Sequence, residues 1–345
     1  MLLSVGIVLY HSYALSSDSA IPGPWYRAFF GSRGKNLGTW CINGFLVLSG
    51  FMLNRSADSG SNGGLRAACA FAMKRLIRIY PGILFVTLVA VFVVGPAFTT
   101  QNVRDYFGDS GTWAYLFTGL NVFARPPVAL PGVFDANAFR QIVNGNLWMI
   151  PWLMWCYILF AAAILLRLHR QRIVVALMWV LALYGCSIEQ VIDPAVTFCG
   201  LWAHDGLRLM GSFVTGWALY LFRDRIRFDG RFALAMLVMT PFWLDSDAHT
   251  ATSCLLSGYV LCTFCFHVRS IPLTERIPRI HWEIFLLSFM VQQGVTAVNG
   301  GGMPQMPNFI YSLAITIPFA LILHSLLDRT SQAIRSQLLP LLERP

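Results

Sequence analysis

The first apolar stretch of the chain ends in a residue that can exchange protons. Residues 2–11 read Leu-Leu-Ser-Val-Gly-Ile-Val-Leu-Tyr-His, so His11 closes a segment that is otherwise almost entirely apolar. A neutral imidazole near pH 7 accepts a proton from a hydroxyl group and gives it up again, as acyl transfer to an alcohol requires. An ionisable residue beside hydrocarbon costs free energy and marks a functional site by default. Position alone fits a histidine at the membrane–water interface equally well.

Composition indicates a polytopic membrane protein. Of the 345 residues, 56% are hydrophobic and 12% are charged, whereas soluble domains carry about 25% charged residues. The net charge of +9 is spread between apolar runs, which indicates membrane orientation rather than nucleic-acid binding. The eight cysteines form no CxxC pair. Cys156, Cys254, Cys262 and Cys265 lie in apolar runs, which favours core positions over disulfides or metal ligands.

Ten apolar segments divide the chain, and they predict an all-α polytopic membrane protein with about ten transmembrane helices. The segments are approximately 1–15, 37–53, 82–98, 146–166, 173–188, 207–222, 232–244, 250–268, 282–298 and 308–327. Several approach the ~20 residues that cross a bilayer as a helix, while the fifth, sixth and seventh are marginal in length. A further apolar piece, residues 113–123, is shorter, and we interpret it as a re-entrant or interfacial element.

The distribution of basic residues supports this count. With a cytoplasmic N-terminus and one crossing per segment, eighteen of the 25 Lys and Arg residues fall on the cytoplasmic side and six outside, with Arg208 at the edge of its segment. This positive-inside pattern predicts that both termini are cytoplasmic. We expect a membrane domain over residues 1–328 and a cytoplasmic tail over 329–345. The connection 99–145, rich in Gly, Pro and Asn, is expected to form a lid or an acceptor-binding surface.

Four motifs occur in a fixed order along the chain. They are Val5–His11, which ends in Tyr-His; Phe45–Leu53, FLVLSGFML; Lys74–Pro81, KRLIRIYP; and Asn146–Trp148, followed by Pro151 and Tyr157. The ordered set resembles the integral-membrane acyltransferase 3 family, bacterial enzymes that O-acylate polysaccharides, lipopolysaccharide and other envelope glycans. Order and spacing agree from residue 1 to about residue 325.

The resemblance implies a role for each motif. His11 is implied as the catalytic base. Acyl-CoA, usually acetyl-CoA, is implied as a co-substrate presented from the cytoplasm rather than as a permanently bound cofactor. Arg75 and Arg78 lie three residues apart and so share a helix face, where two guanidinium groups are able to hold the donor's phosphates. Ordinary positive-inside anchoring is the alternative for this pair. Pro81 follows them and is expected to lie near the start of the next helix.

Two further residues are assigned to the substrate side. Ser49 precedes Gly50, which permits close approach of another helix or of a thioester, and the Ser49 hydroxyl is expected to hydrogen-bond across that interface. A nucleophilic Ser49 is the less favoured alternative, because no base is adjacent in sequence. Trp148 is expected to line the acceptor or acyl channel, with interface anchoring as the alternative.

Several other polar residues are left outside the predicted site. Four residues of an outside connection either bind sugar hydroxyls or form a solvated loop, and the loop is the commoner case. These are Glu189, Asp193, His204 and Asp205. His324 lies within the last apolar segment and has no partner that the sequence identifies. No cluster of ligand residues has a spacing that suits a metal ion, so none is predicted.

The predicted function is O-acylation of a glycan at the bacterial inner membrane. In this mechanism His11 takes the proton from a glycan hydroxyl as that oxygen attacks the thioester carbonyl. The predicted partners are a glycan or lipid-linked oligosaccharide, the acyl-CoA donor and membrane lipids. A transporter or flippase for a lipid-linked saccharide is one alternative. A degenerate, non-catalytic subunit with the same fold is another, suggested by Leu153 and Gln292, where the family usually has Glu and often His.

The first segment is short for a membrane helix. Residues 1–15 rise only about 22 Å as an α-helix, against a hydrocarbon core of about 30 Å. No basic region precedes the segment and no small-residue cleavage site follows it, so it does not resemble a signal peptide. The family carries an Arg or Lys eleven positions before the histidine, which here falls directly before Met1. We therefore expect the natural chain to begin upstream with such a residue. A native protein whose N-terminal peptide begins at Met1 or Leu2 by mass spectrometry contradicts this expectation.

Overall fold

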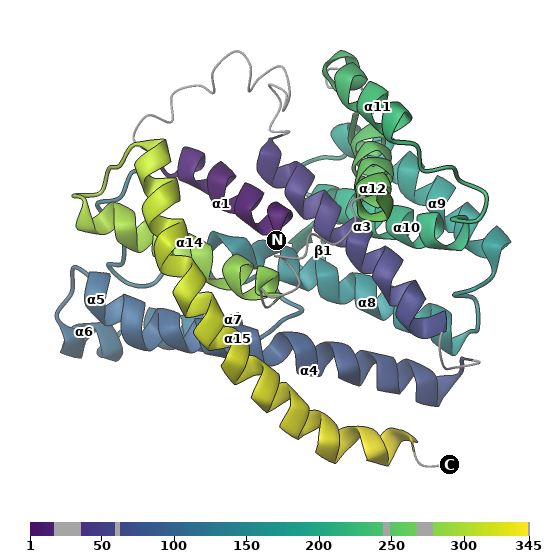
Figure 1. The fold of residues 1–345 in the computed structure, drawn as a ribbon. Helices are drawn as coiled ribbons and strands as arrows, with labels where there is room; N and C mark the ends of the chain where they lie inside the picture. Colours follow the sequence, from purple (N-terminus) through teal and green to yellow (C-terminus); the bar gives the residue numbers. More distant parts are fainter. Residues whose placement is uncertain (17–35, 59–62, 244–248, 268–278, 344–345) are drawn as a thin grey trace. The chain divides into compact units, whose positions relative to one another are not determined.

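Helices are the main secondary structure of the described chain (Figure 1). The computed structural model describes residues 1–16, 36–58, 63–243, 249–267 and 279–343. The helices are α1 Leu2–Ala14, α3 Leu37–Asp58, α4 Leu65–Val89, the π-helix η1 Ala90–Val94, α5 Gly95–Phe98, α6 Val103–Gly108, α7 Ser110–Gly119, the 3₁₀-helix η2 Gly145–Met149, α8 Ile150–Leu165, α9 Arg172–Ser187, the 3₁₀-helix η3 Glu189–Val191, α10 Ala203–Leu221, α11 Gly230–Trp243, α12 His249–His267, α14 His281–Val298 and α15 Gln305–Glu343. Two short antiparallel strands, β1 Thr197–Phe198 and β2 Leu201–Trp202, complete the set.

The chain forms two compact units, which we describe separately. Unit 1 comprises Met1–Pro22, Met73–Pro151 and Pro278–Pro345, and unit 2 comprises Gly23–Ala72 and Trp152–Ile277. Helix α4 contributes its first turns to unit 2 and the rest to unit 1.

The prediction of an all-α membrane protein is confirmed. Each of the ten apolar segments contains a helix. Among the described helices, five runs are long and apolar enough to cross a membrane. They are Leu37–Arg55, Leu65–Phe98, Gly145–Leu165, His249–His267 and Gln305–Gln332. Ten crossings, their orientation and the interfacial role of residues 113–123, which include part of α7, stay predictions. Six of the basic residues counted for orientation lie outside the described residues: Arg27, Arg33, Lys35, Arg269, Arg276 and Arg344.

The expected start of the third segment, at residue 82, is wrong. Helix α4 begins at Leu65 and continues through Pro81. Because proline has no N–H, the carbonyl of Ile77 loses its usual partner one turn earlier in the helix. The hydroxyl of Ser331 on α15 donates to that carbonyl at 3.4 Å. This contact shows how the helix accommodates an internal proline.

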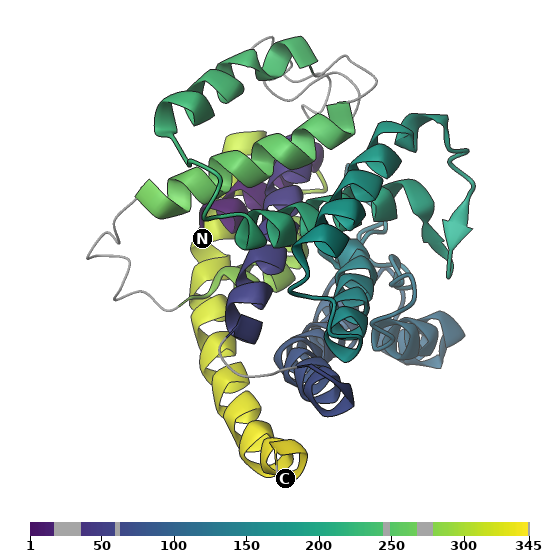
Figure 2. The ribbon, with the colours of Figure 1, turned by 90° about the vertical axis from the view of Figure 1, so that its right-hand side faces the viewer.

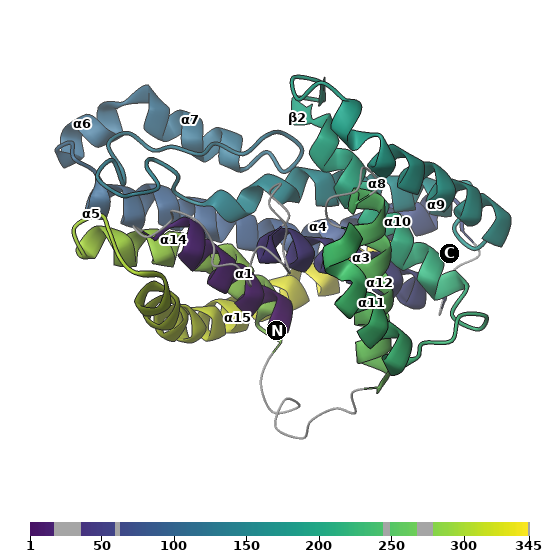
Figure 3. The ribbon, with the colours of Figure 1, turned by 90° about the horizontal axis from the view of Figure 1, so that it is seen from above.

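Unit 1 is built around three helices that pack on one another. Helix α1 contacts both α14 and α15, and α14 packs along α15 (Figure 3). The hydroxyl of Ser4 donates to the carbonyl of His281 at 2.9 Å, at the start of α14. Helix α15 is a single long helix that runs without a break through residue 328, the expected boundary of the tail (Figure 2).

In unit 2, helices α3 and α10 approach so closely that their backbones touch. A Cβ atom added to Gly50 would lie 2.1 Å from the carbonyl oxygen of Phe213. A Cβ atom added to Gly216 would lie 1.9 Å from the carbonyl oxygen of Val47. Each helix therefore presents a glycine to the backbone of the other, as small residues do in membrane helix pairs. The expected close approach of a helix at Gly50 is confirmed.

This crossing generates a prediction about stability. Gly50→Ala or Gly216→Ala should lower the free energy of unfolding by about 1–3 kcal/mol, because the new methyl group overlaps a fixed backbone. The matched control is Gly230→Ala, where the added Cβ meets no atom within 4 Å. Thermal unfolding in detergent checks the difference. Equal midpoints for Gly216→Ala and Gly230→Ala would contradict the close crossing.

Candidate functional site

His11 lies in the last turn of α1, in unit 1, against aromatic rings. The centroid of its ring is 5.0 Å from that of Phe289 on α14, which is nearly perpendicular, and 5.3 Å from that of Tyr10. Its Nδ1 atom is buried and has no hydrogen-bond partner among the described residues. No group in the described part of the chain therefore fixes a proton on Nδ1, and this ring atom is able to accept or donate one.

Gln292 holds α1 in place one turn before His11. Its Nε2 donates to the carbonyl of Val8 at 2.8 Å and to Oδ1 of Asn308 at 3.2 Å. Gln292 lies on α14 and Asn308 on α15, so a single amide connects all three helices of unit 1. Val8, Gln292 and Asn308 are all fully buried. The sequence showed Gln292 only as a departure from the family, and the structure gives it a positioning role.

Asn308 completes this connection from α15. Its Nδ2 donates to Oγ1 of Thr296 at 2.9 Å and to the carbonyl of Gln292 at 3.3 Å. The hydroxyl of Thr296 in turn donates to the Gln292 carbonyl at 2.9 Å. Burying an amide or a hydroxyl without a hydrogen bond costs free energy. This network therefore fixes the register of α15 against α14.

Trp148 lies in η2, and the residues just before it are hydrogen-bonded to α14. Nδ2 of Asn144 donates to the carbonyl of Leu286 at 2.9 Å. Nδ2 of Asn146 donates to the carbonyl of Phe285 and, at 3.2 Å, to Oγ of Ser288. Trp148 is half-buried and belongs to the same unit as His11. Its role in lining a channel stays a prediction.

The two arginines of the third motif lie on α4 within unit 1. Because α4 is continuous there, Arg75 and Arg78 share a face as their spacing predicts. The Arg75 side chain is half-buried, whereas Arg78 is exposed. Their contact with a donor stays a prediction.

Ser49 lies in unit 2, unlike the other four predicted site residues. Its Oγ is 3.4 Å from the hydroxyl of Tyr157 on α8. The expected hydrogen bond across a helix interface is therefore confirmed. A hydroxyl is not a base for serine activation, and this contact favours packing over nucleophilic catalysis at Ser49.

The expectation that His324 has no partner is wrong. Its Nδ1 lies 2.8 Å from Oε1 of Glu283, which is only 5% exposed at the start of α14. The other carboxylate oxygen, Oε2, is buried and has no hydrogen-bond partner among the described residues. The two residues are 41 positions apart, so motif spacing does not predict the pair. The only signal in the sequence is one carboxylate and one imidazole, each within an otherwise apolar segment.

A second, partly buried polar network lies in unit 2. Arg208 pairs with Asp205 at 2.9 Å and donates to Oδ1 of Asn43 at 3.4 Å, while Asn43 donates to Ser253 at 3.3 Å. His204 stands 3.7 Å from the second oxygen of Asp205. Sugar binding by this group stays a prediction. Across the described residues, no group of three or more His, Cys, Asp or Glu side chains is placed to hold a metal ion.

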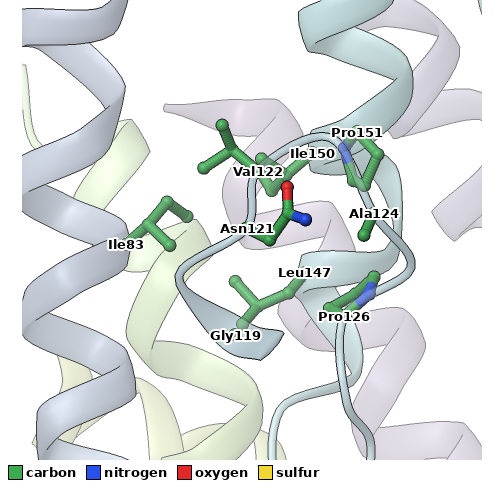
Figure 4. A pocket seen from close by; sticks show the side chains of 9 residues that line it. All are labelled: Ile83, Gly119, Asn121, Val122, Ala124, Pro126, Leu147, Ile150 and Pro151. Atoms are coloured by element: carbon green, nitrogen blue, oxygen red, sulfur yellow. The ribbon is translucent and has the colours of Figure 1, made fainter. Parts of the chain in front are cut away.

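A small hollow in unit 1 carries no chemistry of its own (Figure 4). Its lining is mainly aliphatic, with one amide. The residues are Ile83, Gly119, Asn121, Val122, Ala124, Pro126, Leu147, Ile150 and Pro151. None of them titrates, so the hollow is not the candidate active site.

Comparisons with known proteins agree with the four motifs. The sequence profile of the acyltransferase 3 family, an acyltransferase domain, matches residues 1–329. A protein of Shigella phage Sf6 called an O-acetyl transferase is 23% identical over 320 residues, an alignment that covers 91% of this chain and 88% of the phage protein. No solved structure matches the chain.

The connection of α1, α14 and α15 generates a prediction. Asn308→Ala should lower the free energy of unfolding by about 1–3 kcal/mol, because it removes buried hydrogen bonds to Gln292 and Thr296. The matched control is Asn299→Ala, an exposed residue that directly follows α14 and donates to Val295 of that helix, with an expected change within about 0.5 kcal/mol. Thermal unfolding in detergent measures both. A loss for Asn308→Ala no larger than for Asn299→Ala would contradict the network.

Proposed function

Because the chain belongs to the acyltransferase 3 family, we propose that it is a membrane-embedded O-acyltransferase of the bacterial inner membrane. It moves an acyl group from cytoplasmic acyl-CoA to a hydroxyl of an extracytoplasmic or lipid-linked glycan, such as an exopolysaccharide. The phage relative named O-acetyl transferase favours acetyl as the group transferred. Acyl-CoA is a co-substrate here, and no permanently bound cofactor is required.

The observation that carries this proposal is the environment of His11. Its Nδ1 is buried and unbonded among the described residues, while the backbone one turn earlier is held by Gln292. The imidazole is thus fixed in position through its helix, yet its protonation is not fixed by a partner. A general base needs both properties, since it must be correctly placed and must exchange a proton.

The proposed reaction is direct transfer in one active site. His11 accepts the proton of the glycan hydroxyl as that oxygen forms a bond to the thioester carbonyl carbon. The tetrahedral intermediate collapses with cleavage of the C–S bond, and the departing thiolate takes the proton back from His11. A positioned base of this kind contributes typically about 10²–10⁴ in rate.

The donor and acceptor sides are proposed from the remaining residues. Arg75 and Arg78 provide two guanidinium groups on one face of α4, which suits the phosphates of a CoA thioester. Trp148 offers an aromatic surface beside the α14 contacts of its own segment. Ser49 supports the substrate side through its helix interface and takes no covalent part.

The first test concerns His11. His11→Ala should reduce acyl transfer to the envelope glycan by about 10²–10⁴, because the base is lost, while expression and membrane insertion stay near normal. His267→Ala is the control, an exposed histidine bonded within its own helix, and it should keep full activity. Transfer of labelled acetyl from acetyl-CoA in isolated membranes is the measurement. Unchanged transfer by His11→Ala would contradict the assignment of His11 as the base.

The second test concerns the donor. Arg75→Ala and Arg78→Ala should each weaken acetyl-CoA binding, and the double variant should weaken it further, because each removes a charge-assisted contact. Arg66→Ala removes an exposed arginine from the same helix and should leave binding unchanged. Titration calorimetry measures affinity, and topology reporters run in parallel detect any change in orientation. Intact affinity in the double variant would leave the pair as membrane anchors.

A further inference from the structure

The connection 99–145, expected to form a lid or an acceptor-binding surface, comes close to His11 at one loop. The ring centroid of Phe139 lies 6.4 Å from that of Phe289 on α14. The ring centroid of Phe289 lies 5.0 Å from that of His11. Both separations are typical of aromatic rings in contact, and all three residues belong to unit 1. A single aromatic side chain therefore separates Phe139 from the proposed base.

Gln293 on α14 holds the loop that carries Phe139. Its Nε2 donates to the carbonyl of Phe139 at 2.8 Å and to that of Ile142 at 2.7 Å. Nδ2 of Asn137 donates to Oε1 of Gln293 at 2.8 Å and to its carbonyl at 3.0 Å. Both amide side chains belong to buried residues, where an unbonded amide costs free energy. Gln293 directly follows Gln292, so neighbouring residues of α14 hold the loop and α1.

Two residues of this loop other than glycine have left-handed backbone conformations. Phe134 has a φ of 61° and Gln141 a φ of 62°, values that residues with a side chain seldom adopt. The N–H of Gln141 donates to the carbonyl of Phe134 at 3.4 Å, and its side chain donates to Oδ1 of Asp135 at 3.0 Å. Strained backbone of this kind occurs frequently at ligand-binding and active sites.

The loop leaves Phe139 at the surface. Phe139 is 37% exposed, whereas Phe289 behind it is 4% exposed. Its neighbours in sequence, Arg140 and Gln141, are exposed as well. His11 is itself partly exposed, as a base that receives a substrate must be. The loop thus presents an aromatic ring and polar side chains beside the predicted active site.

An exposed phenylalanine of a membrane protein is often an anchor at the membrane–water interface. An anchor needs only an apolar side chain at the surface. It requires neither a ring contact toward a base nor a buried amide that holds its own carbonyl. These two features favour a role in substrate binding.

We propose that Phe139 binds a sugar ring of the acceptor glycan and so positions the acceptor hydroxyl at His11. The proposal rests on the proposed function. One face of a sugar ring consists mainly of C–H bonds and packs against an aromatic ring, while the hydroxyl groups at its edge hydrogen-bond to polar side chains. The loop supplies such side chains in Arg140, Gln141 and Asp135.

The charge of the loop favours the glycan over the acyl-CoA donor as the bound molecule. Residues 134–142 contain one cation, Arg140, and one anion, Asp135, so their formal charges cancel. The phosphates of a CoA thioester need a surface with excess positive charge. A sugar ring needs an aromatic face and hydrogen-bonding groups, and the loop has both.

The test measures the KM for the glycan. Membranes that contain the chain receive labelled acetyl-CoA and increasing amounts of envelope glycan purified from cells that lack the chain. Phe139→Ala and Phe139→Leu should each raise the KM for the glycan about tenfold, because both remove the aromatic ring. The kcat and the KM for acetyl-CoA should change by less than about twofold, because the ring takes no part in the chemistry. Phe139→Trp keeps an aromatic face and should retain a KM close to that of the wild type.

The matched control is Phe123→Ala, which removes a phenylalanine of the same connection that is 39% exposed, and it should change neither KM. A membrane anchor predicts that Phe139→Leu behaves as the wild type, and that result overturns the proposal. Phe139→Leu keeps an apolar side chain, so it decides the question if Phe139→Ala lowers the thermal midpoint. A wild type that transfers no label to the glycan overturns the proposed function and this inference with it.

Discussion

The structure of unit 1 depends on one buried amide. Gln292 donates to the backbone of α1 and to Asn308 of α15 from its place on α14. In apolar surroundings, leaving any of these groups without a hydrogen bond costs free energy. The three helices are therefore held in one register. This register determines the position of His11, because the hydrogen bond from Gln292 to the carbonyl of Val8 lies one helical turn before it. The catalytic role that we propose for His11 therefore depends on a hydrogen bond that takes no part in the chemistry itself.

Helix packing in the two units shows two different kinds of contact. In unit 2 the glycines at positions 50 and 216 bring two backbones into contact, and the gain is van der Waals packing. In unit 1 the contacts among α1, α14 and α15 include buried amides, hydroxyls and a Glu283–His324 pair. Glycine packing is structural and leaves no group unsatisfied. Polar packing leaves several buried atoms, such as Nδ1 of His11 and Oε2 of Glu283, without a hydrogen-bond partner among the described residues.

Sequence reasoning located the helices because apolar runs of membrane length leave little choice of structure. It placed His11, Arg75, Arg78 and Trp148 in regions that the structure assigns to one unit. It missed the true start of α4, because basic residues from Arg66 to Arg78 lower hydropathy without breaking a helix, and Pro81 suggested a helix start. It also missed the pairing of Glu283 with His324 and the role of Gln292. These depend on contacts between residues far apart in sequence, which hydropathy and motif spacing do not contain.

The central claim is that this chain transfers an acyl group from acyl-CoA to an envelope glycan. Its most direct test uses membranes from cells that carry the chain and from otherwise identical cells that lack it, both supplied with acetyl-CoA labelled in the acetyl group. The account predicts that label enters the glycan as an alkali-labile ester only in membranes that contain the chain. Equal labelling of the glycan with and without the chain would contradict it.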